Sequence, residues 1–374
     1  MKKIIIIGGG ILGLSTAYEL SNENAQITVI DAIYEGAATK AGAGIICPWT
    51  TQRRNLNWYL LAKNGANYYP EFIKKIEKDN ELSHGYAKVG ALVLDNDLDK
   101  LNTIYERVMA RKQTAPEIGT VKILNSSETT KHFSLLNNKY HSIYISGGAR
   151  IDGRKLQNSL INAAKKNGVN FITGTAKLHQ VEQEKPQLDV NNTTLSYDKL
   201  IVTTGAWINE LFTPLDLELR TTFQKGQIAH LQSDGIDTAN MPVIMPPNNQ
   251  YILGFPDNKL VVGATKEPIN IKNAQATTAG KNEIITKASD IIPEINHFSI
   301  EDIRVGFRPN TFNRLPVFGK IKDFNNIIIA TGLGASGLTT GPFIGKLISQ
   351  ITLNKKTDID ITPYFTEQII KRKD

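Results

Sequence analysis

The sequence predicts an α/β protein in which a parallel sheet covered by helices is interrupted by a second domain of mixed or antiparallel sheet. A glycine-rich turn follows an apolar run at the start of the chain, and strand-like runs that lead into helices recur much further along it. Residues from about 86 to 145 and from about 219 to 302 instead alternate short strands with polar turns. Strand–helix alternation is typical of parallel sheets, whereas short strands joined by turns are typical of antiparallel ones.

The turn after the first strand has the spacing of a dinucleotide-binding motif. Ile4–Ile7 is a continuous β-branched run, as expected for a strand buried on both faces. Gly8, Gly10 and Gly13 then form G-x-G-x-x-G, which permits a tight turn, the approach of a pyrophosphate to the backbone, and close helix–strand packing. A helix that begins near Ile11 directs free N–H groups at this phosphate. The arrangement predicts a Rossmann-like nucleotide-binding domain.

A second short strand, QITVI, ends on Asp31. An acid roughly 20 residues after the motif is placed to accept hydrogen bonds from ribose hydroxyls. The loop that follows is rich in small residues, so Thr39, Ala43 and Gly44 permit the close approach of a bound group. A glycine-rich turn without a ligand is the alternative, and the order of strand, motif, helix, strand and acid argues against it.

Three later segments complete the predicted parallel sheet. An amphipathic helix runs to residue 167 with Asp152 as a cap, and Val169–Ile172 follows as a strand. The strand LIVTT leads into Gly205, and Ile327–Ala330 is the last apolar strand. We therefore expect a discontinuous nucleotide-binding domain over residues 1–85, 146–218 and 303–374, and an inserted substrate-binding domain over residues 86–145 and 219–302.

The glycine motif recurs after the last strand, at Gly332, Gly334 and Gly337. No acidic residue ends a strand about 20 residues later, which argues against a second dinucleotide site. The free N–H groups of this helix N-terminus instead suit the negative charge that develops near N1 and C2=O of a reduced isoalloxazine. The motif therefore indicates a flavin rather than a nicotinamide.

The composition excludes several other classes of protein. The 374-residue chain has 43 Lys and Arg against 36 Asp and Glu, a formal net charge of +7. These basic residues are scattered, which indicates a solvated surface and no nucleic-acid partner. Six isolated histidines predict no metal site, and the single Cys47 excludes an internal disulfide. We expect no membrane span and a cytoplasmic location, with peripheral membrane association and a homo-oligomer left open.

The order of these motifs resembles the FAD-dependent D-amino-acid oxidase superfamily, most closely its glycine oxidase and D-amino-acid dehydrogenase branches. The resemblance covers nearly the whole chain. It rests on GGGILG with Asp31, the T-x-x-x-A-G element, VTTGAW, KGQ, YILG, LVVGAT, GFRP and the closing ATGLGASGLTTGP. It implies a flavoenzyme with non-covalent FAD, because the chain lacks the later cysteine and the early histidine to which relatives attach flavin.

The resemblance also implies roles for matching residues. Arg308 in GFRP forms a bidentate pair with the substrate carboxylate, which the planar guanidinium suits and lysine does not. Tyr251 assists the same carboxylate, although an aromatic residue in a strand can equally serve sheet packing. Lys177 holds the adenine through its backbone. The expected cofactor-binding residues are Gly8, Gly10, Ile11, Leu12, Gly13, Asp31, Ala32, Thr39, Lys40, Ala43, Gly44, Ile45, Lys177, Gly205, Leu333, Gly334, Ala335, Ser336, Gly337, Leu338 and Thr339.

The implied reaction is the oxidation of a small amino acid, either a D-amino acid or a glycine-like amine, by hydride transfer from Cα to flavin N5. Oxygen or a quinone is the expected electron acceptor. Glycine oxidases tend to carry an arginine where this chain has Ala335, so we expect a less cationic pocket and leave glycine itself open. Two alternatives remain, an N-methyl or cyclic imino acid oxidoreductase and a flavoprotein subunit that passes electrons to a partner.

Overall fold

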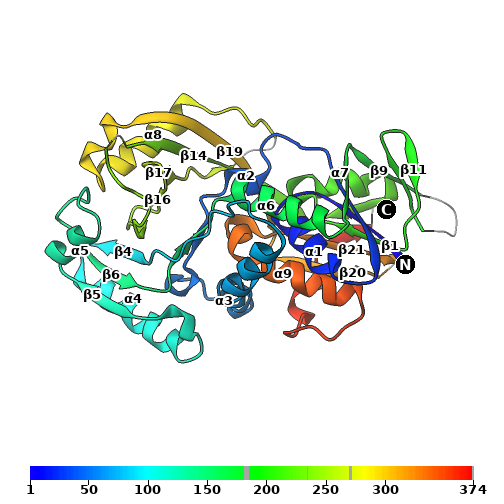
Figure 1. The fold of residues 1–374 in the computed structure, drawn as a ribbon, viewed down its shortest axis with the longest axis horizontal. Helices are drawn as coiled ribbons and strands as arrows, with labels where there is room; N and C mark the ends of the chain where they lie inside the picture. The colour runs from blue at the N-terminus through cyan, green and yellow to red at the C-terminus, as the bar shows by residue number, and fades with distance from the viewer. Residues whose placement is uncertain (181–184, 234, 269–271, 323, 373–374) are drawn as a thin grey trace.

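The computed structural model of the chain describes residues 1–180, 185–233, 235–268, 272–322 and 324–372. The described strands form two large sheets, which lie toward opposite ends of the molecule in Figure 1. One sheet is mainly parallel and the other is mainly antiparallel, so the predicted α/β fold class with a mixed second sheet is confirmed.

The first sheet, here called sheet A, is parallel apart from its edge strand β20, which pairs antiparallel with β21. Buried Ile4–Ile7 lies at the centre of the sheet, as its continuous apolar sequence predicts. Because the parallel strands share one direction, their carboxyl ends meet at one edge. The strand order is β20-β21-β12-β1-β2-β8, comprising Val317–Ile321, Phe324–Thr331, Lys199–Val202, Lys2–Ile7, Ala25–Asp31 and Asn170–Thr173.

Helices α1 (Ile11–Ser21) and α9 (Gly337–Thr352) cover one face of sheet A and lie directly against each other. A Cβ atom on Gly341 of α9 would lie 3.0 Å from Ile11, and one on Gly345 would lie 2.7 Å from Ser15. This register makes the two helices parallel, so both of their N-termini lie at the same end. Helices α3 (Leu56–Asp79) and α6 (Gly153–Lys166) pack against these two helices.

Smaller elements complete this half of the molecule. The opposite face of sheet A packs against a short helix and a three-stranded antiparallel sheet of the described residues, α7 (Ile208–Phe212) with β9 (Ala176–His179), β10 (Gln187–Val190) and β11 (Thr193–Leu195). Further short elements are α2 (Ala38–Ala41), the pair β3 (Ile45–Ile46) and β7 (Ala149–Arg150), and the pair β13 (Leu217–Leu219) and β22 (Ile370–Arg372).

The second sheet, here called sheet B, follows the order β18-β14-β17-β16-β15-β4-β6-β5. Strands β18 and β17 pair with successive parts of one edge of β14, and β19 pairs along its other edge. Its strands are antiparallel except for the β15–β4 pair. The boundary expected at residue 303 falls inside β19, and the division into domains stays a prediction. The strands are Glu267–Pro268, Thr221–Gln232, Lys259–Gly263, Tyr251–Phe255, Val243–Met245, Ala91–Asp95, His141–Ile145, Val121–Leu124 and, for β19, Ser299–Thr311.

The expectation of strands and turns alone in this half was incomplete, because helices lie between the strands. Asp97 caps α4 (Leu98–Lys112), because its carboxylate accepts hydrogen bonds from the backbone N–H groups of Asp99 and Lys100, at 3.0 and 3.2 Å. Only Leu101 and Val108 of α4 are buried, so the apolar stripe that would reveal the helix in the sequence is thin. The additional helices are α4 (Leu98–Lys112), α5 (Ser126–His132) and α8 (Thr278–Ser289). Across the described residues, no helix is long and apolar enough to cross a membrane.

Candidate active site

A cavity of about 690 Å³ opens at the carboxyl ends of the parallel strands in sheet A. It is lined by residues that end or follow four of these strands, namely Ile7 of β1, Asp31 of β2, Thr203 after β12 and Thr331 of β21. Ligands of open α/β sheets bind at this edge of the sheet. Strands β16 and β19 of sheet B contribute the opposite wall.

The cavity brings together the predicted site residues, although their positions are far apart in the chain. Arg308, Tyr251 and the expected cofactor-binding residues all line it, with the exceptions of Gly13 and Ser336. Gly13 lies behind the turn, and the Ser336 hydroxyl accepts a hydrogen bond from the Trp58 indole at 3.2 Å. The roles of these residues toward the cofactor stay predictions.

The first glycine turn has the geometry that a pyrophosphate site needs. Gly8 has a φ of 109°, and a Cβ on Gly13 would lie only 1.9 Å from the Gly8 carbonyl oxygen. A Cβ on Gly10 would meet only the Thr39 hydroxyl within 4 Å, at 3.3 Å, so the backbone there is open toward the cavity. Gly8 and Gly13 therefore shape the turn, and Gly10 leaves the space that a phosphate would occupy.

Residues around this turn hold it in place. The Thr203 hydroxyl donates to the carbonyl oxygens of Ile7 and Gly8, at 3.0 and 3.1 Å. The Gln157 amide donates to the Gly9 carbonyl at 2.7 Å. Sequence reasoning missed both residues, and the only signal for Thr203 was its place in the VTTGAW segment. Their bonds stiffen the turn before any ligand arrives.

Gly44 has a role in backbone packing, and its expected role toward a bound group stays a prediction. The sequence suggested that it permits the close approach of a bound group. A Cβ at this position would lie 1.7 Å from the Ile151 carbonyl oxygen, and Gly44 has a φ of 87°. The missing side chain is therefore required for backbone packing and chain direction, even though the residue also borders the cavity.

Both parallel helices, α1 and α9, direct their N-termini at the cavity. Ile11 and Leu12 of α1 line it, as do Gly337 and Leu338 of α9. Helix N-termini carry unpaired N–H groups and a partial positive charge, so two of them at one cavity favour an anionic ligand. Among the described residues that line the cavity, basic side chains outnumber acidic ones by six to two, which adds to the positive potential. The basic residues are Lys40, Arg53, Lys177, Lys266, Arg308 and Arg314, and the acidic residues are Asp31 and Glu210.

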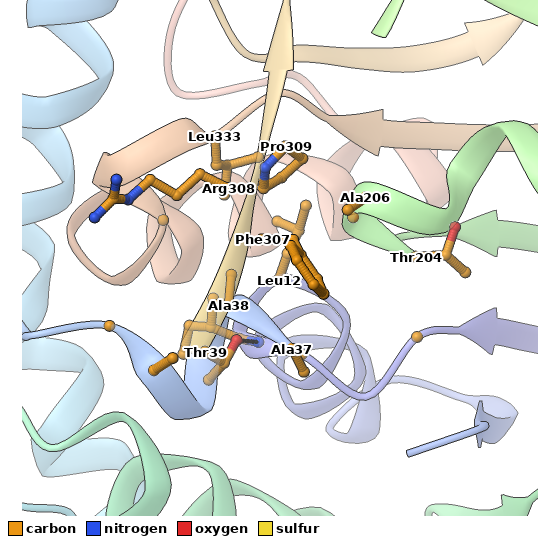
Figure 2. Close-up of a pocket in the computed structure, with 18 of the residues that line it drawn as sticks. Leu12, Ala37, Ala38, Thr39, Thr204, Ala206, Phe307, Arg308, Pro309 and Leu333 are labelled. Carbon is orange, nitrogen blue, oxygen red and sulfur yellow. Dashed lines mark hydrogen bonds between the residues drawn. The ribbon is translucent and has the colours of Figure 1, made fainter. Parts of the chain in front are cut away.

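Arg308 extends from β19 into the cavity, in the opposite direction to its neighbour Phe307 (Figure 2). Its Nη1 donates to the Thr265 carbonyl at 3.1 Å and to the Gln224 side chain at 3.4 Å. Tyr251 lies beside it, where burial raises the pKa of the phenol and the Arg308 charge partly opposes that shift. The phenol is therefore a protonated donor at neutral pH next to a guanidinium with neutral partners.

Gly226, in the KGQ segment, makes room for this guanidinium. A Cβ on Gly226 would lie 2.5 Å from Nη2 and 2.6 Å from Cζ of Arg308. The clash would involve the far end of a flexible side chain, so the arginine would have to move. The sequence does not predict this role for Gly226, because no local pattern relates it to a residue on the neighbouring strand.

Residues 3–351 match a protein-family model described as FAD dependent oxidoreductase. The chain belongs to this family. It is 44% identical over 365 residues to the uncharacterized oxidoreductase YurR of Bacillus subtilis (strain 168), covering 97% of this chain and 98% of that protein. The enzyme is therefore an FAD-dependent oxidoreductase, as the sequence resemblance implied.

Solved structures agree with this assignment. The iminodiacetate oxidase from Chelativorans sp. BNC1 superposes with a TM-score of 0.94 and 37% identity, over 97% of this chain and 98% of that one. The glycine oxidase from Geobacillus kaustophilus superposes with a TM-score of 0.86 and 20% identity, over 98% and 99% of the two chains, which shows a shared fold. The open turn at Gly10 and the two helix N-termini fit the pyrophosphate and flavin of FAD.

We expect the FAD to be released when the protein is denatured by acid or heat. The described residues that line the cavity include neither cysteine nor histidine. Cys47 is buried, and burial raises the pKa of its thiol to about 12, so a reactive thiolate is disfavoured. The absorbance spectrum and chromatographic identity of the supernatant check this expectation. Flavin that stays with the precipitated polypeptide would show covalent attachment.

Proposed function

We propose that the enzyme oxidises the C–N bond of a small, glycine-like amino acid that it holds by the carboxylate. The observation that carries this proposal is the Arg308 guanidinium, which faces the cavity with hydrogen bonds to Thr265 and Gln224 and no acidic partner among the described residues. A planar fork of donors matches a carboxylate, and charge-assisted pairs of this type are strong. The Tyr251 phenol supplies a further donor beside it.

The chain's own residues would act mainly by orientation and electrostatics. Thr265 and Gln224 hold the Arg308 fork, which fixes the carboxylate and directs Cα into the cavity. When bound, FAD supplies the acceptor for the hydride that leaves Cα. The lone pair of a neutral substrate amine assists this departure, so no protein base is required. Hydrolysis of the resulting imine in water would give the carbonyl product and the free amine, and oxygen or a quinone would take up the two electrons.

A second candidate is an N-substituted amino acid, in which the oxidised C–N bond belongs to a secondary amine. The similarity to the iminodiacetate oxidase from Chelativorans sp. BNC1 favours it, since that relative is 37% identical over nearly the full length of both chains. The carboxylate contact is the same for both candidates, and they differ only in the substituent on nitrogen.

Anaerobic bleaching of the flavin absorbance tests the proposal directly. The holoenzyme would be mixed with glycine, N-methylglycine, iminodiacetate, proline and D- and L-alanine, and with methylamine as an amine without a carboxylate. We expect bleaching by at least one carboxylated amine and none by methylamine. Bleaching by methylamine alone would contradict the carboxylate anchor and favour an oxidase of simple amines. Bleaching by none of these compounds would contradict the proposal and favour a flavoprotein subunit that passes electrons to a partner.

A further inference from the structure

Two further arginines, Arg53 and Arg314, line the same cavity as Arg308. Arg53 precedes α3, and its Cζ lies 4.5 Å from the centroid of the Trp58 ring. Trp58 is buried and donates its indole N–H to Ser336, in the turn that opens α9. Arg53 therefore stacks on an aromatic ring that is anchored beside Ala335. Ala335 is the position where glycine oxidases tend to carry an arginine and this chain does not.

Arg314 reaches the cavity from the connection between β19 and β20. It has a left-handed backbone with a φ of 57°, which is uncommon for a residue other than glycine. Asn313 stabilises this connection, because its side-chain oxygen accepts from the Leu315 backbone N–H at 3.0 Å and lies 3.0 Å from the Thr311 hydroxyl. The turn is thus held by side-chain bonds in a conformation in which Arg314 lines the same cavity as Arg53.

The two guanidinium groups are close enough to affect each other. Desolvation lowers the pKa of Arg53, and the positive charge of Arg314 lowers it further. Among the described residues, neither side chain has an acidic partner within 4.0 Å. Like charges that line one cavity without a counter-ion are unfavourable, and an anion bound by both would remove the repulsion. Arg308 is already assigned to one substrate carboxylate, so this pair is available to a second anionic group.

We propose that Arg53 and Arg314 form a second carboxylate subsite and that the substrate is an amine carrying two carboxylate groups. This inference rests on the proposed function, which places the first carboxylate on Arg308. The amine then lies between two cationic anchors, and an amino acid with a single carboxylate would leave the second anchor without a partner. Arg53 and Arg314 are therefore specificity-determining residues. Their role is separate from that of Arg308, which holds the carboxylate common to all amino acid substrates.

Binding of unreactive analogues to the holoenzyme tests the subsite without turnover. Diglycolate carries two carboxylates and no amine, and methoxyacetate carries one. Dissociation constants would be measured by calorimetry and by the change in flavin absorbance. We expect tighter binding of diglycolate, and about a 10- to 100-fold loss of its affinity in Arg53→Met or Arg314→Gly, with methoxyacetate unaffected. Methionine keeps an unbranched chain on Trp58, and glycine tolerates the left-handed backbone.

Arg54→Met is the matched control, because it removes the same charge from a neighbouring residue that does not line the cavity. We expect this variant to keep the wild-type preference for diglycolate. Equal affinity for the two analogues in the wild type, or an unchanged preference in both cavity variants, would overturn the subsite.

Turnover measurements distinguish a failure of the second subsite from a failure of the proposed function on which it rests. The ratio of kcat/KM for iminodiacetate to that for N-methylglycine should fall in Arg53→Met and Arg314→Gly and hold in Arg54→Met. Oxidation of both amines with an unchanged ratio would refute the second subsite while leaving the proposed function intact. Oxidation of none of the carboxylated amines tested above, with diglycolate still preferred, would refute the proposed function while supporting the pair of arginines as an anion site.

Discussion

Arg308→Ala is expected to lower kcat/KM for the best amino acid substrate by about 30- to 4,000-fold while the protein keeps its FAD and its fold. Removing one partner of a desolvated, hydrogen-bonded charge pair costs roughly 2–5 kcal/mol, and about 1.4 kcal/mol corresponds to a factor of ten. Arg308→Lys should recover only part of the activity, because an ammonium group offers a point charge without the fork. Steady-state kinetics and flavin content measure both effects.

Two further variants sharpen this test. Arg304→Ala removes an arginine from the same strand that pairs with Asp302 and does not line the cavity, so its activity should stay near that of the wild type. Gly226→Ala keeps Arg308 but places a Cβ where the guanidinium lies, so we expect a raised KM with FAD retained. An Arg308→Ala enzyme with unchanged kcat/KM would remove Arg308 from the site and, with it, the main reason for proposing an amino acid substrate.

Gly10→Val is expected to abolish FAD binding without unfolding the chain. Gly10 has a φ of −75° and a ψ of 178°, an extended conformation that valine adopts readily, so backbone strain is not introduced. A Cβ there would meet only the Thr39 hydroxyl within 4 Å, which leaves the side chain in the space assigned to the pyrophosphate. Flavin occupancy after purification, measured by absorbance, checks the first expectation, and circular dichroism checks the second.

The size of the substituent provides the control for this variant. Gly10→Ala should reduce FAD affinity less than Gly10→Val, because the loss follows the volume placed at the turn. Full flavin occupancy in a folded Gly10→Val protein would show that the phosphate binds elsewhere, and the Gly8–Gly13 turn would then be structural only. A valine variant that fails to fold even with added FAD would instead assign Gly10 a role in chain packing.

Local sequence determined the parallel sheet and its glycine turns. The run Ile4–Ile7 forms a buried strand because β-branched residues suit a sheet that is covered on both faces. Asp152 caps α6 by accepting from the backbone of Arg154 and Lys155, at 2.8 and 3.0 Å. These features depend on neighbours in the chain, so periodicity and capping residues reveal them.

Only the tertiary structure decided how the cavity wall is assembled. Arg53 and Ser336 are joined through Trp58, Gly226 clears a space for Arg308 on the adjacent strand, and Arg314 lines the same cavity as Arg53. Each of these contacts joins residues far apart in sequence, and no periodic pattern or spacing encodes such a pairing. The expectation of a pocket less cationic than that of glycine oxidases considered the single position Ala335 and stays a prediction. The basic residues that line the cavity come from several elements, which only the fold brings to the same place.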